Sequence, residues 1–153
     1  MIYLGSDHAG FRLKENIKKY LLEQGMEVED LGARVLNPDD DYPDFVIPVA
    51  KKVAENGEHY RGIVFGWSGQ GEAMAVNKVR GIRAAVYYGG SLELMKLSRQ
   101  DNNANVLSLG AGFITKEQAI EAVALWLKTP FEGGRHERRL KKIEEFEKNQ
   151  NSA

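Results

Sequence analysis

Short apolar runs alternate along the chain with longer segments whose apolar residues recur at helical spacing. The runs at 2–5, 26–32, 61–66, 81–88 and 105–110 predict five strands. Between them, apolar residues three and four positions apart predict helices over 11–24, from about 45 to 57, through Met74 and Val76, over 91–99 and over 116–128. This alternation predicts a parallel sheet with helices on both faces.

The pattern therefore favours a three-layer, Rossmann-like, doubly wound α/β fold with a five-stranded parallel sheet. A length of 153 residues fits a single domain over 1–153, whose last few residues we expect to be disordered. Pro48 leaves the start of the second helix open, because proline removes a helical N–H donor. Residues 135–150 have a helical period but are very polar, so we expect this helix to pack on something other than its own core.

Ligands of doubly wound sheets bind beyond the carboxyl ends of the strands. In this chain that rule selects the loops after Gly5, Gly32, Gly66, Tyr88 and Gly110.

Composition narrows the classes of function. The formal net charge of −1 favours neither nucleic acid nor an anionic membrane as a partner. The chain has no cysteine, which excludes disulfides and thiolate chemistry, and its three histidines lack metal-ligand spacing, so we expect no metal. No apolar stretch approaches the roughly 18 residues of a membrane helix, and the first residues lack the basic flank of a signal peptide. We expect a cytoplasmic protein.

The segment GWSGQGE at 66–72 follows a predicted strand and opens a helix. Its backbone N–H groups would face outward with the helix dipole behind them, which is typical of an anion site. Known fingerprints fail: Met74 breaks the dinucleotide pattern, Gln70 breaks the nucleophile elbow, and Glu72 stands where a Walker loop has lysine. A tight turn, with Glu72 favourable in the first helical turn, explains the pattern slightly better than an anion site does.

A second strand-end loop, SDHAG at 6–10, places a carboxylate next to an imidazole. His8 could contact a phosphate and Asp7 could accept a sugar hydroxyl, while the alternative is that Asp7 or Ser6 only caps the first helix. Tyr42, from the loop DDDYPD, could reach the same rim.

Arg135 and Arg139 are four residues apart, so they share a helix face and could bind one phosphate together. A solvated charged face is the alternative, and nucleic-acid binding is weakly supported in a net-acidic chain. Oxyanion donors beside a carboxylate, an Asp–His pair and paired arginines together suit a small phosphorylated polyol.

Several segments of the chain together resemble a known family. It is similar to the ribose-5-phosphate isomerase B family, which includes the galactose-6-phosphate isomerase subunits, through the segments GSDHAGFRLK, DYPDF, GWSGQGEAMAVNKVRGIRAA, SRQDNNANVLSLGA and FEGGRHERRLKKI. The resemblance implies a Rossmann-like domain that forms dimers and interconverts aldose and ketose phosphates through a cis-enediol, without metal or cofactor.

The resemblance also implies the residues of catalysis. One branch of the family uses a cysteine base at the position of Gly66, and the other uses a glutamate at the position of Glu72, so this chain is similar to the glutamate-base branch. Glu72 would then move the proton between C1 and C2, and Ser68 would assist transfer at O1 and O2. The loop N–H groups at Gly69 and Gly71 would stabilise the enediolate oxygen.

The implied substrate ligands come from three parts of the chain. The sugar hydroxyls would be bound by Asp7 and Tyr42, the phosphate by His8, Arg135 and Arg139, and Asn102 would enter the site across a dimer interface. Such shared sites, in a homodimer or a dimer of dimers, would explain the polar last helix.

Two departures from the family pattern concern the substrate. Asp101 replaces the ring-opening histidine and Gly112 replaces a phosphate-binding arginine. An ionised aspartate does not readily protonate a ring oxygen unless its pKa is raised. The sequence therefore leaves open an isomerase of ribose 5-phosphate, an isomerase of a tetrose or hexose phosphate, and a non-catalytic sugar-phosphate-binding protein. A nucleotide binder is disfavoured by the absent fingerprints.

Overall fold

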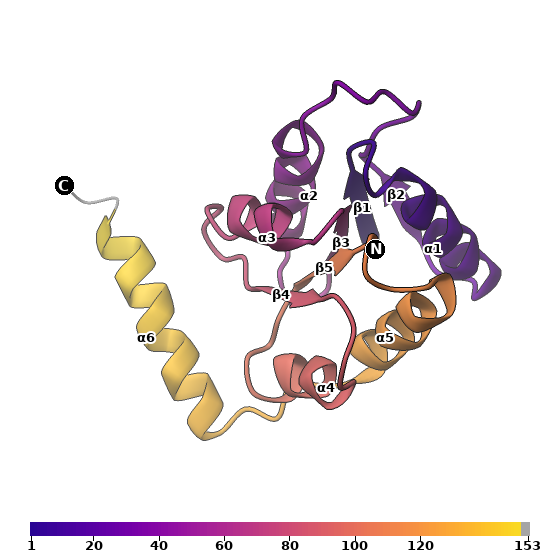
Figure 1. Ribbon diagram of the computed structural model, residues 1–153. Coiled ribbons are helices and arrows are strands. Elements are labelled where there is room, and N and C mark those ends of the chain that lie inside the picture. Colours follow the sequence, from indigo (N-terminus) through magenta and orange to yellow (C-terminus); the bar gives the residue numbers. More distant parts are fainter. Residues whose placement is uncertain (151–153) are drawn as a thin grey trace.

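The computed structural model describes residues 1–150, in which strands and helices alternate along the chain (Figure 1). The elements are β1 (Ile2–Ser6), α1 (Phe11–Glu23), β2 (Val28–Asp30), α2 (Pro43–Glu55), β3 (Arg61–Gly66), α3 (Gln70–Val76), β4 (Ala84–Tyr87), α4 (Glu93–Gln100), β5 (Val106–Gly110), α5 (Lys116–Lys128) and α6 (Arg135–Gln150). The expectation of disorder concerns 151–153 and lies outside the described residues.

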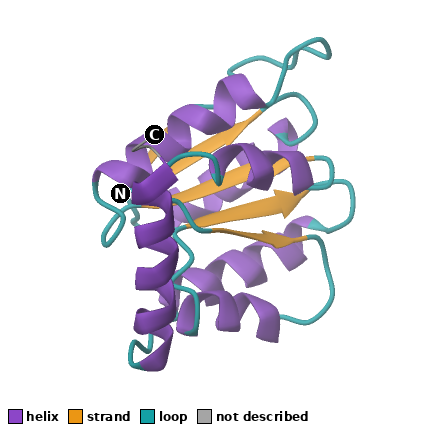
Figure 2. Cartoon of the chain, turned by 90° about the vertical axis from the view of Figure 1, so that its left-hand side faces the viewer, coloured by secondary structure: helices purple, strands orange, loops and turns teal. Residues whose placement is uncertain are grey.

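The five strands form one parallel sheet in the order β2-β1-β3-β5-β4. Figure 2 shows the strand arrows pointing the same way, with helices in front of and behind them. The chain runs from β1 to the edge strand β2 on one side and returns to β3 beside β1; it then goes to the far edge strand β4 and comes back to β5, which lies between β3 and β4. The predicted doubly wound fold is confirmed, and its switch point, where such sheets bind ligands, lies between β1 and β3.

The core consists of two apolar layers, one on each face of the sheet. Ile63 and Phe65 of β3 pack in the layer beneath α1, α4 and α5, whereas Val64 packs in the layer beneath α2 and α3. This division follows from the two-residue period of a strand. A central parallel strand is buried on both faces, which is why RGIVFG is continuously apolar after its first residue.

Three elements differ from the prediction at their ends. The strands predicted over 26–32 and 81–88 are shorter, because β2 and β4 are the edge strands and pair on one side only. The second helix begins at Pro43 and contains Pro48. Pro48 lies in the second turn, so the helix loses one hydrogen bond there and continues to Glu55.

The last helix, α6, projects from the body of the molecule rather than covering the sheet (Figure 1). It buries His136 and Leu140 near its start, while Ile143 and Phe146 are 52% and 62% exposed. Neither core layer includes a residue of α6. Its packing on a partner subunit stays a prediction. No helix within residues 1–150 has both the length and the apolar character needed to cross a bilayer.

Candidate active site

The loops that follow β1 and β3 meet at the switch point of the sheet. Ser6 pairs with Phe65 in the parallel register, so Asp7 and Gly66 leave neighbouring strands at the same level. Neighbouring strands lie about 4.8 Å apart, so the two strand-end loops selected from the sequence are adjacent in space. The structure thereby brings Asp7 and His8 next to the GWSGQGE segment.

The turn from β3 into α3 is held by a left-handed glycine and two hydroxyl groups. Gly69 has φ of 79° and precedes the helix, a conformation that favours glycine. The hydroxyl of Ser108 donates to the Gly69 carbonyl at 2.7 Å, and the hydroxyl of Ser68 accepts from the N–H of Gln70 at 3.3 Å. The N–H of Gln70, the first residue of α3, is therefore used within the turn, and the anion-site interpretation of the loop N–H groups stays a prediction.

Glu72 is the buried acid of this turn. It is 5% exposed, and its carboxyl group folds back over Gly66 so closely that a Cβ added at position 66 would overlap Oε1. Position 66 must therefore be glycine while Glu72 keeps this conformation. Burial raises the pKa of Glu72 above its ordinary value, the charge of Asp7 raises it further, and the Glu72 backbone N–H partly offsets both. A raised pKa makes the ionised carboxylate a stronger base.

Asp7 lies in the same cluster but does not cap a helix. Its Oδ1 accepts from the N–H of Ala9 at 3.0 Å, whereas the cap position of α1 is Gly10, which has no side-chain cap bond. The capping alternative is therefore wrong for Asp7, and for Ser6, whose buried hydroxyl has no hydrogen-bond partner within residues 1–150. The second oxygen of Asp7, a residue 6% exposed, lies 3.9 Å from Nδ1 of His8, so the carboxylate and the imidazole adjoin at the site.

His8 is oriented by an aspartate that the sequence did not single out. Its Nδ1 donates to Oδ1 of Asp40 at 2.7 Å, and its backbone N–H donates to the same oxygen at 2.9 Å. The hydrogen bond to Asp40 raises the pKa of His8, against the smaller effect of desolvation. This arrangement favours an imidazolium, which suits an anionic ligand.

Tyr42 closes the rim from the opposite loop. A Cβ built on Gly71 would lie 2.6 Å from the Tyr42 hydroxyl oxygen, so the phenol lies directly against the first turn of α3. Tyr42 thus reaches the rim that carries Glu72, and Gly71 is required by this close approach.

Lys14 anchors the loop that supplies Asp40 and Tyr42. Its side chain is fully buried, and its Nζ donates to Asp30 Oδ2 at 2.5 Å and to the Ala33 carbonyl at 3.1 Å. Sequence reasoning missed Lys14 and Asp40. The signal for Lys14 was its place beside Ile17 and Leu21 on the apolar face of the predicted helix.

Trp67 occupies the space that a side chain at position 112 would need. A Cβ on Gly112 would lie 2.5 Å from Cδ2 and Cε2 of the indole, and the Gly112 N–H donates to the Trp67 carbonyl at 2.9 Å. The indole also meets the Phe113 ring edge-to-face, with 6.2 Å between centroids. The glycine that replaces the expected arginine is therefore coupled to Trp67, which the sequence analysis did not weigh.

The remaining predicted residues lie at the opposite edge of the sheet. Asp101 ends α4 and leads into the amino end of β5, and its Oδ1 lies 3.4 Å from Nε2 of the buried His136. Asn102 and the two arginines of α6, Arg135 and Arg139, are exposed near it. The five residues of β5 separate its two ends by roughly 15 Å. Figure 2 likewise shows α6 toward the ends at which the strands begin.

One chain therefore contains two separate groups of predicted site residues. We call them the strand-end cluster, which holds Asp7, His8, Tyr42, Ser68, Gly69, Gly71 and Glu72, and the α6 cluster, which holds Asp101, Asn102, Arg135 and Arg139. The structure brings the members of each cluster together but does not join the two clusters within a chain.

Within residues 1–150, two groups of side chains have ligand atoms of the kind that bind metals close together. They are Asp7, His8 and Asp40, and Asp101, Glu132 and His136. In the first group the short contact between His8 Nδ1 and Asp40 is a hydrogen bond, so that nitrogen carries a proton and is not a free ligand. The expectation that the protein needs no metal stays a prediction.

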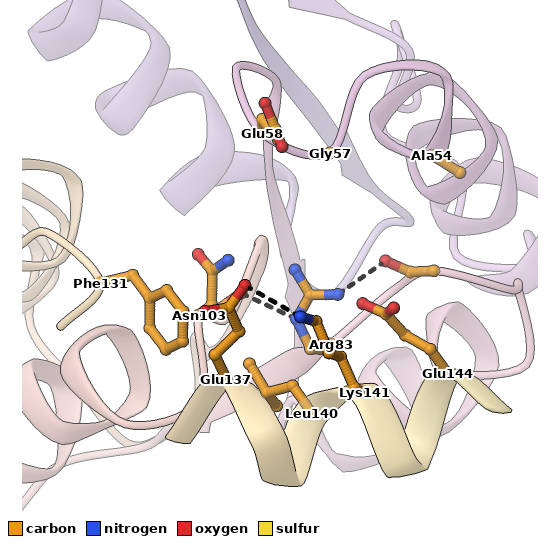
Figure 3. A pocket seen from close by; sticks show the side chains of 11 residues that line it. Ala54, Gly57, Glu58, Arg83, Asn103, Phe131, Glu137, Leu140, Lys141 and Glu144 are labelled. Atoms are coloured by element: carbon orange, nitrogen blue, oxygen red, sulfur yellow. Dashed lines mark hydrogen bonds and ion pairs between the residues drawn. The ribbon is translucent and has the colours of Figure 1, made fainter. Parts of the chain in front are cut away.

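A pocket of ≈460 Å³ lies away from the strand-end cluster, between α6 and the body (Figure 3). Arg83 crosses it and donates to the carbonyls of Asn103 at 3.0 Å and Gly81 at 3.4 Å. On α6, Lys141 and Glu137 form an ion pair at 3.6 Å. Three of its charged residues, Arg83, Glu137 and Lys141, are thus bonded within the chain, and no residue of the strand-end cluster lines this pocket.

The fold and the strand-end cluster define a class: a doubly wound α/β protein with a buried carboxylate, helix N–H groups and a protonatable imidazole at its switch point. A model of the Ribose/Galactose Isomerase family matches residues 2–143, and the chain belongs to this family.

The comparisons include relatives over nearly the whole chain. The probable ribose-5-phosphate isomerase B of Mycoplasma genitalium is 44% identical over 147 residues, covering 96% of this chain and 95% of the relative. The ribose-5-phosphate isomerase B of Mycobacterium tuberculosis H37Rv is 40% identical over 149 residues, covering 96% and 90%.

Solved structures agree with the fold. The Mycoplasma genitalium enzyme with bound ribulose 5-phosphate superposes with a TM-score of 0.92 at 44% identity, covering 96% of this chain and 95% of that one. The Clostridium thermocellum ribose-5-phosphate isomerase B gives a TM-score of 0.90 at 44% identity, covering 97% and 98%.

Proposed function

We propose that this protein is a cofactor-independent aldose–ketose isomerase that interconverts ribose 5-phosphate and ribulose 5-phosphate. The observation that carries the proposal is the buried Glu72 carboxyl group, which folds back over Gly66 at the end of β3 and whose pKa is raised by burial. The relatives named ribose-5-phosphate isomerase B, one of them solved with ribulose 5-phosphate, support the choice of sugar.

The chemistry follows from the strand-end cluster. Glu72 removes the proton from C2 of the open-chain aldose, and the electrons of that C–H bond form the C1=C2 bond of a cis-enediolate. The negative charge on O1 is stabilised by the N–H groups of Gly69 and Gly71. Ser68 moves the proton between O1 and O2, and Glu72 returns its proton to C1, which leaves the ketone at C2. No electrons leave the sugar, so the step needs no redox cofactor.

Glu72 has two properties that suit this step. At neutral pH an ordinary glutamate, with a pKa of about 4.3, is ionised but weakly basic. Burial in the turn raises the pKa of Glu72, which strengthens the base, and excludes water from the developing oxyanion. Asp7 and Tyr42 would hold the sugar hydroxyls, and His8 the phosphate.

A homodimer, or a dimer of such dimers, would complete each site with the α6 cluster of the neighbouring subunit. This assembly is supported by the separation of the two clusters at opposite edges of the sheet. It is also supported by Ile143 and Phe146, apolar side chains that α6 leaves exposed within one chain. Metabolic enzymes of this kind act in the cytoplasm, where we place this protein.

A second substrate is favoured by one observation. Asp101 stands where the resemblance places a ring-opening histidine. Its Oδ1 lies 3.4 Å from Nε2 of His136, so this position carries a carboxylate in place of the expected imidazole. Erythrose 4-phosphate has no free O4 with which to close a furanose ring, so it would need no ring-opening acid. A tetrose phosphate is therefore the alternative substrate. A protein that only binds sugar phosphates would have no use for the buried Glu72.

The test is proton NMR of the protein with ribose 5-phosphate in deuterated water, with erythrose 4-phosphate alongside. We expect ketose formation with deuterium entering the sugar, and a loss of about 10³-fold or more in Glu72→Gln. Glu117→Gln, an exposed glutamate on α5, is the matched control and should turn over normally. Retained turnover in Glu72→Gln would remove Glu72 from the base role, and silence of the unmodified protein with both sugars would refute the proposed function.

A further inference from the structure

A pocket of ≈450 Å³ adjoins the strand-end cluster on the side of α1. It is lined by His8, Ala9, Arg12, Leu36 and Trp67. It is next to the reacting groups in the chain as well as in space, because His8 follows Asp7, and Trp67 follows the glycine over which Glu72 folds. A substrate with its C1 and C2 at Glu72 would extend its far end along this rim.

Two basic side chains line the pocket, and one of them has no hydrogen-bond or ion-pair partner within residues 1–150. Within residues 1–150, Arg12 forms no hydrogen bond or ion pair. Other exposed arginines, such as Arg80, likewise have no partner among these residues, whereas the less exposed Arg61, Arg83 and Arg99 bond backbone carbonyls, so what sets Arg12 apart is its place in this pocket. The second basic group, His8, is oriented by Asp40. An unpaired guanidinium beside an oriented imidazole is suited to a doubly charged phosphoryl group.

The pocket wall nearest position 112 is the indole of Trp67 rather than a basic side chain. Trp67 covers Gly112 so closely that a side chain at 112 has no room, which removes the place from which another cation could enter. Trp67 and Leu36, 62% and 54% exposed, instead give the pocket apolar walls. Apolar walls lower the local dielectric constant and strengthen the attraction between a phosphoryl dianion and Arg12.

We propose that Arg12 is a phosphate-binding residue of this protein, and that it supplies from the first turn of α1 the positive charge that position 112 cannot supply. The inference rests on the proposed function only for the identity of the phosphoryl group as that of a sugar phosphate. It assigns Arg12 to the same chain that carries Glu72, so its contribution does not depend on the α6 cluster of a neighbouring subunit.

The experiment compares Arg12→Gln with Arg80→Gln, which removes an exposed arginine from the turn between α3 and β4. Three quantities are measured on each purified protein: the rise in Tm caused by inorganic phosphate, and KM and kcat for ribose 5-phosphate. Loss of a charge-assisted hydrogen bond to phosphate should raise KM roughly ten- to a hundredfold, with the smaller part of the effect in kcat. Arg12→Lys keeps the charge and should restore part of the loss.

The phosphate measurement separates this inference from the proposed function. If the unmodified protein is stabilised by phosphate and Arg12→Gln is not, the role of Arg12 stands even where no isomerisation is detected. If Arg12→Gln matches the unmodified protein and Arg80→Gln in phosphate stabilisation and in KM, the proposal is wrong. Absence of phosphate stabilisation in the unmodified protein would also overturn it. The Tm values without phosphate show that each variant is folded, since Arg12 is exposed and pairs with nothing that holds the fold.

Discussion

Adding a single methyl group at Gly66 tests the position of the base. In Gly66→Ala the new Cβ would lie 1.8 Å from Oε1 of Glu72, 2.0 Å from its Cδ and 2.4 Å from Oε2. Ordinary van der Waals contact begins at 3.4 Å, so the carboxyl group has to move by about 1.6 Å, which is 3.4 minus 1.8. These three atoms are the nearest neighbours of the new methyl group, and they are the far end of a flexible side chain.

The consequence for the rate follows from this displacement. A misplacement of about 1 Å can cost roughly 10²-fold in the chemical step. We therefore expect kcat for ribose 5-phosphate to fall at least about 10²-fold in Gly66→Ala, which corresponds to about 2.7 kcal/mol in the activation free energy. Because the methyl group displaces a side-chain end and no backbone, Tm should change little.

The assay is kcat for ribose 5-phosphate together with the rate at which deuterium from solvent enters the sugar. Gly57→Ala is the matched control, since its new Cβ would meet Asn105 Nδ2 at 3.3 Å and only a slight adjustment is needed. Both rates should fall in Gly66→Ala and remain normal in Gly57→Ala. Near-normal kcat in a folded Gly66→Ala protein would refute the reasoning, because the base would then not be the carboxylate that lies over position 66.

Two further predictions concern the acids of the two clusters. Burial raises the pKa of Glu72 in the folded state, so the folded protein binds this proton more tightly than the unfolded chain and loses stability as pH rises through the two pKa values. Glu72→Gln should therefore raise Tm more at pH 8 than at pH 4 in thermal scans, and an equal effect at both pH values would contradict the pKa shift. In Asp101→His, the ratio of the ribose 5-phosphate rate to the erythrose 4-phosphate rate should rise about tenfold or more, because an imidazole can open the furanose ring. An unchanged ratio would mean that Asp101 does not limit ring opening.

The fold could be predicted because its signals are local and repeated. Each strand is a short apolar run, each covering helix has one apolar face, and the alternation permits few topologies. The ends of the edge strands could not be predicted, because β2 and β4 end where their single neighbour stops pairing. The position of Asp101 could have been deduced from topology alone: a loop that follows a helix and enters a parallel strand lies at the amino edge of the sheet.

The site residues could be predicted only where they follow a strand directly in the sequence. Glu72 and Asp7 follow β3 and β1 in sequence, so the rule for doubly wound sheets located them. Asp40 and His8 are 32 positions apart, and their hydrogen bond depends on the path of the loop that Lys14 anchors. No local pattern indicates such a contact, because the tertiary structure selects the partner.

Two glycines of the site are best understood through the side chains that cover them. At Gly66 the Glu72 carboxyl group fills the volume that a side chain would occupy, and the resemblance places the cysteine base of the other branch at that same position. A cysteine at position 66 and a glutamate at position 72 would thus place their reactive groups in the same volume, and only one of these two side chains fits there. At Gly112 the Trp67 indole fills the corresponding volume, and the basic group faces the pocket from Arg12 instead. A glycine at an expected site position is therefore a reason to ask which neighbouring side chain has taken its space, rather than to infer that the function is lost.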